Sequence, residues 1–243
     1  MISESELEEL LERARGNPEA DQEFFRRLLD ATLHVHTPIS DDSTKLRLIQ
    51  FKHPDGFNAI PCFTSVSKAA AAAGHWARIM TFKGRELLEM TRGATLMINP
   101  NDGGAVLYPE EIESLLNTGS IAQLSTESFT GERFWFDTPA WQPAWLIPVL
   151  TDTLAQQSSV EVAYLIQKAP EDNPNAASLL IVLGVGASNA ERAARACLTS
   201  VQTQAQPSLR NTVIDLTTYD PAEGVPDFVS ESGVEPFYRR ENQ

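Results

Sequence analysis

Hydrophobic and polar residues follow one another in patterns that predict short helices at the start of the chain. Ser3 and Glu6 have the spacing of a capping box, which predicts a helix from about Glu4. Asn17 followed by Pro18 predicts a second helix, with a capping oxygen ahead of a proline in the first helical position. The domain therefore begins with a helical extension that reaches to about residue 30.

Strand and helix patterns then alternate through the first half of the chain. Strands are predicted over residues 32–36, 45–51, 57–64, 95–99 and 105–108. Helices are predicted over residues 66–73, 83–92 and 109–116, each closed by a glycine that follows it. The sequence Pro54-Asp55-Gly56 is typical of a turn and predicts that the second and third strands form a hairpin.

The second half shows the same kind of alternation between helix and strand patterns, without repeating the sequence. Helices are predicted over residues 145–156, 190–202 and 226–232, and strands over 160–168, 178–185, 212–216 and 234–239. Short polar turns between successive strands favour antiparallel pairing, with helices mostly on one face. The predicted fold class is α+β, with two domains, each a mixed or largely antiparallel sheet covered by helices.

The domain boundaries follow from a change of character in the middle of the chain. Residues 1–119 form the first predicted domain and residues 144–243 the second. Residues 120–143 mix Ser, Thr and Gly with several aromatic side chains, which makes this connection too aromatic for a free linker. We expect it to pack on both domains, or to pair as a strand over residues 133–137.

Composition and charge exclude several classes of protein. The 243 residues include 33 acidic and 19 basic side chains, a net charge of −14. This surplus disfavours binding to nucleic acid or to anionic membrane surfaces. The polar, acidic N-terminus is unlike a secretory signal, and the longest apolar run is far too short to span a bilayer. A cytoplasmic protein is the expectation.

Two histidines and a cysteine are the first candidates for chemistry. His34 and His36 lie two apart on a predicted strand and so share a face, but no third ligand completes a metal site, and we predict a polar strand face. Cys62 ends a strand before a helix, where the helix dipole could stabilise a thiolate. A buried cysteine that packs as a small hydrophobe is the simpler interpretation.

Two glycine-containing loops suggest ligand sites and are better explained by local structure. Residues 184–189 join a strand to a helix with a G-x-G pattern, but lack the third glycine of a dinucleotide loop. Residues 99–104 lack the distal glutamate of a calcium loop, and their Asn, Asp and Gly are typical of a turn. No catalytic, cofactor or metal site is therefore predicted.

The aromatic residues of the middle segment are the main candidate for function. Phe129, Phe134, Trp135 and Trp141 could form a surface for a protein partner, because such side chains supply desolvated contact area. The alternative is that they fill an interdomain core.

The segments resemble the SseB family, named for enhanced serine sensitivity in bacteria. In the first half the resemblance is carried by IPCFTS at 60–65, GATLMINP at 93–100 and PEEI at 109–112. In the second half it is carried by VAYL at 162–165 and EPFYRR at 235–240. Asn99 and Pro100 match the family pattern most clearly, and we expect them to form a structural turn.

The resemblance implies a bacterial cytoplasmic protein of two α+β domains without an established enzymatic activity or cofactor. The family name records a phenotype, sensitivity to serine on overproduction, and supplies no catalytic residues. The leading hypothesis is a non-catalytic interaction or regulatory protein that binds another protein or a second copy of itself. The alternatives are a thiol-dependent enzyme of sulfur or serine metabolism that uses Cys62, and an amino-acid sensor with its site at residues 184–189.

Overall fold

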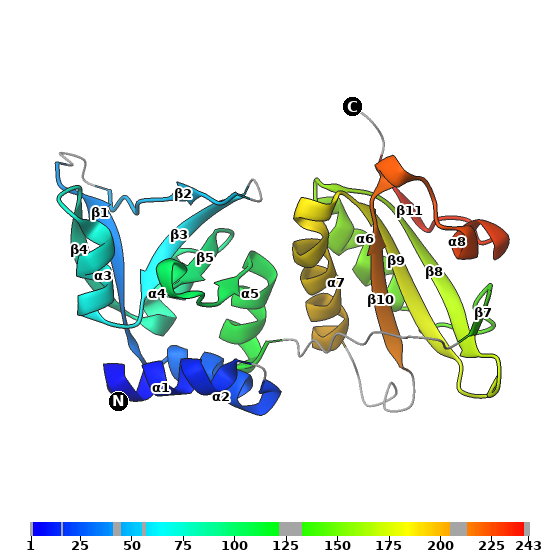
Figure 1. Ribbon diagram of the computed structural model, residues 1–243, viewed down its shortest axis with the longest axis horizontal. Coiled ribbons are helices and arrows are strands. Elements are labelled where there is room, and N and C mark those ends of the chain that lie inside the picture. Colours follow the sequence, from blue (N-terminus) through cyan, green and yellow to red (C-terminus); the bar gives the residue numbers. More distant parts are fainter. Residues whose placement is uncertain are drawn as a thin grey trace. The chain divides into compact units, whose positions relative to one another are not determined.

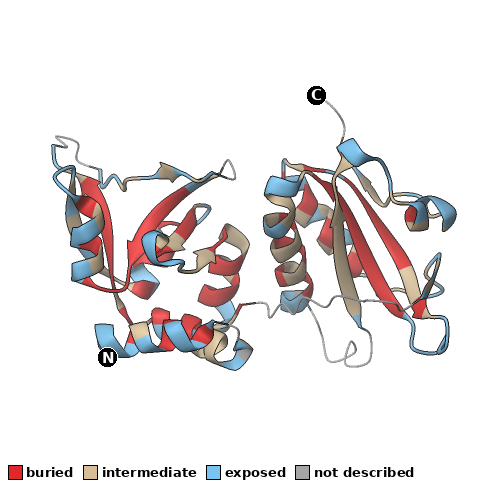
Figure 2. Cartoon of the chain, in the orientation of Figure 1, coloured by how far each residue is buried: buried red, intermediate tan, exposed pale blue. Residues whose placement is uncertain are grey.

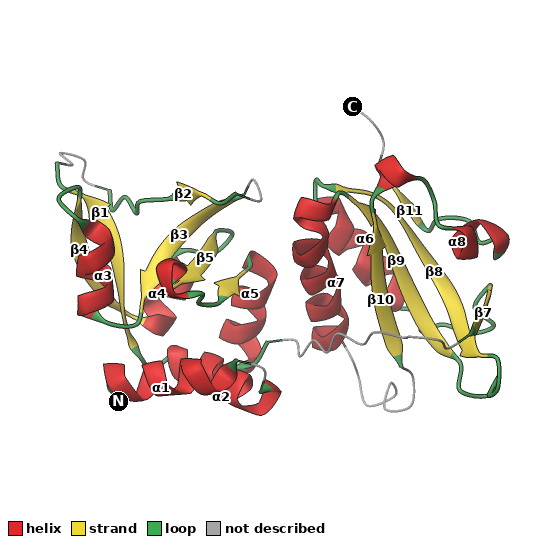
Figure 3. Ribbon diagram, viewed as in Figure 1, coloured by secondary structure: helices red, strands yellow, loops and turns green. Residues whose placement is uncertain are grey.

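The computed structural model describes residues 2–15, 17–40, 45–54, 57–121, 133–204 and 213–240. The chain divides into two compact units, Met1–Gln123 and Leu124–Gln243, and each has its own sheet and its own hydrophobic clusters. In both units helices flank a mixed, mainly antiparallel sheet (Figure 3). The predicted two-domain α+β fold is confirmed.

The sheet of the N-terminal unit has the strand order β4-β1-β3-β5-β6, and β2 pairs with β3 at one end. Its strands are β1 (Thr32–Pro38), β2 (Phe51–Lys52), β3 (Asn58–Phe63), β4 (Ala77–Lys83), β5 (Thr95–Ile98) and β6 (Val106–Leu107). Only the β3–β5 pair is parallel among these strands; the others run antiparallel. The carboxyl ends of β3 and β5 therefore meet at one edge of the sheet.

The described residues of this unit also form the α-helices α1 (Glu4–Ala14), α2 (Pro18–Leu28), α3 (Val66–Ala73), α4 (Gly84–Met90) and α5 (Pro109–Thr118). The capping box of Ser3 and Glu6 is present at α1, and the Asn17 side chain accepts hydrogen bonds from the start of α2. Ser65 caps α3, and Gly74 ends it. These helix boundaries agree with the local signals in the sequence.

One hydrophobic core joins the first two helices to the sheet. Leucines of α1 pack in the same cluster as Leu33 and Val35 of β1 and Ile60 and Cys62 of β3. The helical start of the chain is thus an integral part of the N-terminal unit. In Figure 2 the inward sides of these helices and strands are coloured as buried.

The sheet of the C-terminal unit has the order β10-β9-β8-β11, with β7 also paired to β8 (Figure 1). Its strands are β7 (Phe134–Asp137), β8 (Val160–Pro170), β9 (Ser178–Val185), β10 (Ile214–Tyr219) and β11 (Tyr238–Arg239). The helices α6 (Leu146–Gln156) and α7 (Ala190–Gln204) cover one face, and the short α8 (Asp227–Glu231) covers part of the other.

Two strands differ from the sequence prediction, and one of its alternatives is present. The strand β4 was not predicted, because its sequence lacks alternation and its side chains at the sheet edge are only partly buried. β2 is two residues long, shorter than the predicted strand, although its antiparallel pairing with β3 makes the expected hairpin. Residues 134–137 of the middle segment pair with β8, as the strand alternative proposed. Every helix among the described residues is too short or too polar to cross a membrane.

Candidate functional site

The two histidines of β1 are occupied by contacts inside the N-terminal unit. His34 hydrogen-bonds the Thr81 hydroxyl through Nδ1 and the Glu4 carboxylate through Nε2, both at 3.0 Å. His36 Nε2 donates to the carbonyl oxygen of Ala69 at 2.9 Å. Within the described ranges no group of three or more His, Cys, Asp or Glu side chains could hold a metal ion. These imidazoles tie β1 to β4, α1 and α3.

Cys62 is fully buried on β3, where it lies between Val35 of β1 and Ile98 of β5. Removal from water raises the pKa of its thiol to about 12, because burial penalises the thiolate. A reactive cysteine needs the opposite environment, with solvent access and nearby positive charge. The geometry favours the packing role and gives the thiol-enzyme alternative no support.

Two motifs of the family resemblance, IPCFTS at 60–65 and GATLMINP at 93–100, meet at the carboxyl ends of β3 and β5. Asn99 Oδ1 accepts from the backbone N–H of Thr64 at 3.1 Å, and Asn99 Nδ2 donates to the Thr64 hydroxyl at 2.8 Å. The Asn99 backbone is left-handed, with φ of +46°, and its N–H donates to the carbonyl of Cys62 at 2.8 Å. Asparagine tolerates this conformation better than most residues.

Helix α1 contributes the Glu8 carboxylate to this junction. The Thr64 hydroxyl donates to Glu8 Oε1 at 3.1 Å, and Lys68 of α3 lies 3.8 Å from the same oxygen. Lys68 also pairs with Asp102 at 2.6 Å, and this hydrogen bond raises the pKa of the lysine. The sequence pattern did not indicate this network, because its members lie far apart in the chain. The polar atoms of this network form hydrogen bonds and ion pairs with one another, so the network has a structural role.

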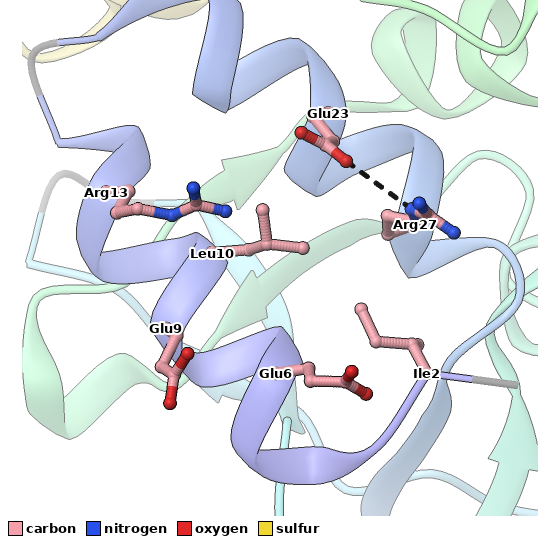
Figure 4. Close-up of a pocket in the computed structure, with 7 residues that line it drawn as sticks. All are labelled: Ile2, Glu6, Glu9, Leu10, Arg13, Glu23 and Arg27. Carbon is pink, nitrogen blue, oxygen red and sulfur yellow. Dashed lines mark ion pairs between the residues drawn. The ribbon is translucent and has the colours of Figure 1, made fainter.

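A shallow depression lies between α1 and α2 (Figure 4). It has a volume of about 280 Å³ and is lined by Ile2, Glu6, Glu9, Leu10, Arg13, Glu23 and Arg27. Glu23 and Arg27 pair along one face of α2 at 3.6 Å, the (i, i+4) spacing of an ordinary surface ion pair. The mixture of exposed acids and bases is typical of a solvated helix surface.

The loop at residues 184–189 has a packing explanation for its first glycine. A Cβ atom on Gly184 would lie 2.6 Å from Val162 Cγ1 and 2.9 Å from the Tyr219 hydroxyl, so only glycine fits between β8 and β10. Gly186 has open space around it, with φ of −59°. The pattern that resembles a phosphate loop therefore contains one glycine required for sheet packing.

The aromatic residues of β7 divide between the two faces of the C-terminal sheet. Phe134 lies beneath the Lys168 ammonium at 4.9 Å, and Phe136 contacts Phe228 of α8 with ring centroids 4.8 Å apart. Trp135 occupies the intervening position, so its side chain points to the other face, and it is 63% exposed. Phe129 lies outside the described residues.

A pocket opens on the Trp135 side of this sheet. It has a volume of about 420 Å³, and Trp141, 60% exposed, forms part of its wall. Its lining comes from the segment after β7, the start of α6, strand β8 and the segment before β11: Thr138, Pro139, Ala140, Trp141, Gln142, Ile147, Leu165, Gly233, Val234, Glu235 and Phe237. We call Trp135, Trp141 and this pocket the tryptophan surface. Sequence alternation along β7 could have separated Trp135 from Phe134.

Comparison with known proteins assigns both halves of the chain. The model of the SseB protein N-terminal domain matches residues 7–114, and that of the SseB protein C-terminal domain matches residues 130–240. Protein SseB of Escherichia coli (strain K12) is 29% identical over 248 aligned positions, which cover 98% of this chain and 93% of that protein. Protein SseB of Shigella flexneri matches to the same extent. No solved structure matches the chain. Because the two domain models together account for most of its length, the chain belongs to the SseB family.

Proposed function

We propose that this protein is a non-catalytic interaction protein that binds another polypeptide through the tryptophan surface. The observation that carries the proposal is the exposure of Trp141, which lines a pocket of about 420 Å³, and of Trp135, three residues before the lining segment begins at Thr138. Tryptophan is enriched among the residues that dominate binding energy at protein interfaces. A pocket of this size lies within the range of sites that bind small ligands and single side chains.

The chemistry of the remaining candidates supports the same proposal. The Cys62 thiol is buried, and the histidines of β1 are engaged in hydrogen bonds within the N-terminal unit. Cys62 is a free thiol, which is the usual state in a reducing compartment, and we propose that the protein acts in the bacterial cytoplasm.

The test is quantitative affinity capture with matched variants. The wild-type chain, the double variant Trp135→Ala/Trp141→Ala and the control Trp76→Ala are tagged alike and used to capture proteins from native lysate at several salt concentrations. Trp76 is a suitable control because it is 85% exposed and lies in the N-terminal unit. Circular dichroism first establishes that all three chains are folded.

We expect a stoichiometric partner that wild type and Trp76→Ala retain and that the double variant loses. Sedimentation of the purified chain identifies the case in which the partner is a second copy. A partner retained equally by all three chains, or no stoichiometric partner at any salt concentration, would contradict the proposal.

A further inference from the structure

Strand β4 is an edge of the N-terminal sheet (Figure 1), and among the described residues it pairs with β1 alone. Two hydrogen bonds show which of its backbone groups face away from β1. The Gly84 N–H, one residue past β4, donates to the Ala31 carbonyl at 2.9 Å, so even-numbered positions face β1. The Ile49 N–H donates to the His36 carbonyl at 2.9 Å from the other side of β1, so His36 and its neighbour Ile79 do not exchange hydrogen bonds. The odd-numbered residues of β4 therefore point their N–H and C=O groups outward.

The outward backbone groups at the start of β4 are unpaired within the described part of the chain. They belong to Ala77, Ile79 and Thr81, and this stretch spans about 17 Å of strand. The stretch is open to solvent, because the side chains of Arg78, Met80 and Thr81 are exposed. Unpaired N–H and C=O groups on an accessible edge strand form a template that another extended chain can pair with.

We propose that this edge binds the same edge of a second copy of the chain, as an antiparallel β4–β4 pair with its two-fold axis at Ile79. In this register Ala77 of one copy is opposite Thr81 of the other, and Ile79 is opposite itself. Each outward N–H and C=O of the open stretch then has a partner. The inference goes beyond the proposed function, because the strand belongs to the N-terminal unit and its pairing does not depend on what the tryptophan surface binds.

The two neighbouring registers of a β4–β4 pair are each disfavoured by one residue. A shift of two residues in one direction brings Arg78 opposite Arg78 of the second copy, and like charges directly opposite one another are destabilising. A shift of two residues in the other direction brings Ala77 opposite Lys83, whose N–H already donates to the Glu86 carboxylate at 3.4 Å. The register centred on Ile79 avoids both conflicts and pairs the open stretch with itself.

The side chains at this edge also suit a second copy. Met80 comes opposite Arg78 of the second copy, so an apolar side chain meets the aliphatic part of the arginine. Trp76, one residue before β4 and 85% exposed, comes opposite Phe82 when the register continues by one residue, and cross-strand aromatic pairs stabilise antiparallel sheets. The strand carries two basic residues and no acidic one, whereas the whole chain has a net charge of −14. Each copy therefore presents a basic edge to a negatively charged partner.

Sedimentation of the purified full chain from about 1 to 200 µM tests the pairing, because an interface of one short strand pair is expected to be weak. Wild type should shift from monomer to dimer over this range. Met80→Lys places an ammonium group opposite Arg78 of the second copy and should weaken association at least about tenfold, whereas Met80→Glu places a carboxylate there and should associate at least as tightly as wild type. The two variants lose the same methionine, and circular dichroism first establishes that both are folded.

A charge exchange and hydrogen exchange test the register directly. The double variant Arg78→Glu/Met80→Lys again places opposite charges face to face and should restore the dimerisation that Met80→Lys loses. In the ¹⁵N-labelled wild-type chain, the amides of Ile79 and Thr81 should exchange their hydrogens at least about fivefold more slowly at the highest protein concentration than at the lowest. The amide of Met80 faces β1, so its exchange should not depend on concentration.

A chain that remains monomeric at the highest concentration would overturn the proposal, and so would a Met80→Glu variant that associates no more tightly than Met80→Lys. A dimer that Met80→Lys keeps and Trp135→Ala/Trp141→Ala loses would place the second copy on the tryptophan surface and likewise overturn β4 pairing. Trp76→Ala should weaken self-association and leave capture of a different polypeptide unchanged. Failure of this inference therefore leaves the proposed function standing, and a β4 dimer without any other captured partner has the reverse meaning.

Discussion

Asn99 holds Thr64 by two hydrogen bonds, one to its backbone N–H at 3.1 Å and one to its hydroxyl at 2.8 Å. The pair joins the ends of the two parallel strands, and both residues are buried. Through the Thr64 hydroxyl it also reaches Glu8 of α1. A change at Asn99 should therefore affect the whole N-terminal unit.

We expect Asn99→Ala to lower the free energy of unfolding by about 2–4 kcal/mol, from two buried hydrogen bonds and a strained left-handed backbone. Asn99→Gly should cost less, because glycine adopts this backbone freely. Urea denaturation measures both changes. The control is Asn101→Ala at the exposed next-but-one position. Equal losses of unfolding free energy for the two alanine variants would show that the contact between Asn99 and Thr64 does not stabilise the fold.

The Cys62 thiol should resist alkylation in the folded protein. With a pKa of about 12, its thiolate fraction at pH 7 is on the order of 10⁻⁵, and its burial blocks access. Iodoacetamide labelling followed by mass spectrometry should show modification of Cys62 only after denaturant is added. Rapid labelling of the native chain at Cys62 would instead restore the thiol-enzyme hypothesis.

The Cys62 thiol should make the free energy of unfolding fall at high pH. Its pKa is raised from 9.0 to about 12 by burial, so the folded state favours the protonated form. The associated stability is complete below pH 9 and declines as the pH rises through the interval to about 12. Cys62→Ala should flatten that part of the stability profile relative to wild type.

The two glycines at 184 and 186 should respond differently to alanine. Gly184→Ala places a methyl group against Val162 and Tyr219, and overpacking of this kind costs about 1–3 kcal/mol. Gly186→Ala enters open space with a compatible backbone and should leave stability unchanged or gain about 0.4–1 kcal/mol. Thermal denaturation of both variants tests this. A loss of similar size at Gly186 would argue for a role of the loop beyond packing.

The ion pair between Lys68 and Asp102 should contribute little despite its short distance of 2.6 Å. Both side chains are substantially exposed to solvent, so Lys68→Met should cost less than about 1 kcal/mol. A double-mutant cycle with Asp102→Asn measures the coupling, which should shrink as salt is added. Because the pKa of Lys68 is raised from 10.5, any contribution is complete below that pH and is lost at higher pH. A salt-independent coupling would contradict this account.

Local signals in the sequence predicted the parts of the fold that depend on neighbouring residues. The capping box at Ser3, the cap at Ser65 and the glycine that ends α3 were each read from a few adjacent positions and are present in the structure. The strand β4 was missed, because an edge strand is held by pairing with β1 and needs no alternating pattern of its own. Tertiary pairing overrides the weak local preference there.

Finding the candidate sites required distances between side chains, which the sequence alone does not give. Nothing in the spacing of Glu8, Thr64 and Asn99 indicates that their side chains form one network, since the contacts depend on the sheet order. The exposed tryptophans were found from residue type alone, but their separation from Phe134 depended on the faces of β7.

The engagement of α1 with the sheet has a practical consequence for shortened versions of the protein. Four apolar side chains of this helix, Leu7, Leu10, Leu11 and Ala14, belong to the core, and its Glu8 satisfies the Thr64 hydroxyl. A fragment that starts at the first strand would expose the apolar side chains that this helix covers, and the Thr64 hydroxyl would lose its acceptor on Glu8. Expression and crystallisation work on the N-terminal half should therefore retain the opening helix, and purification tags are better attached at the other end of the chain.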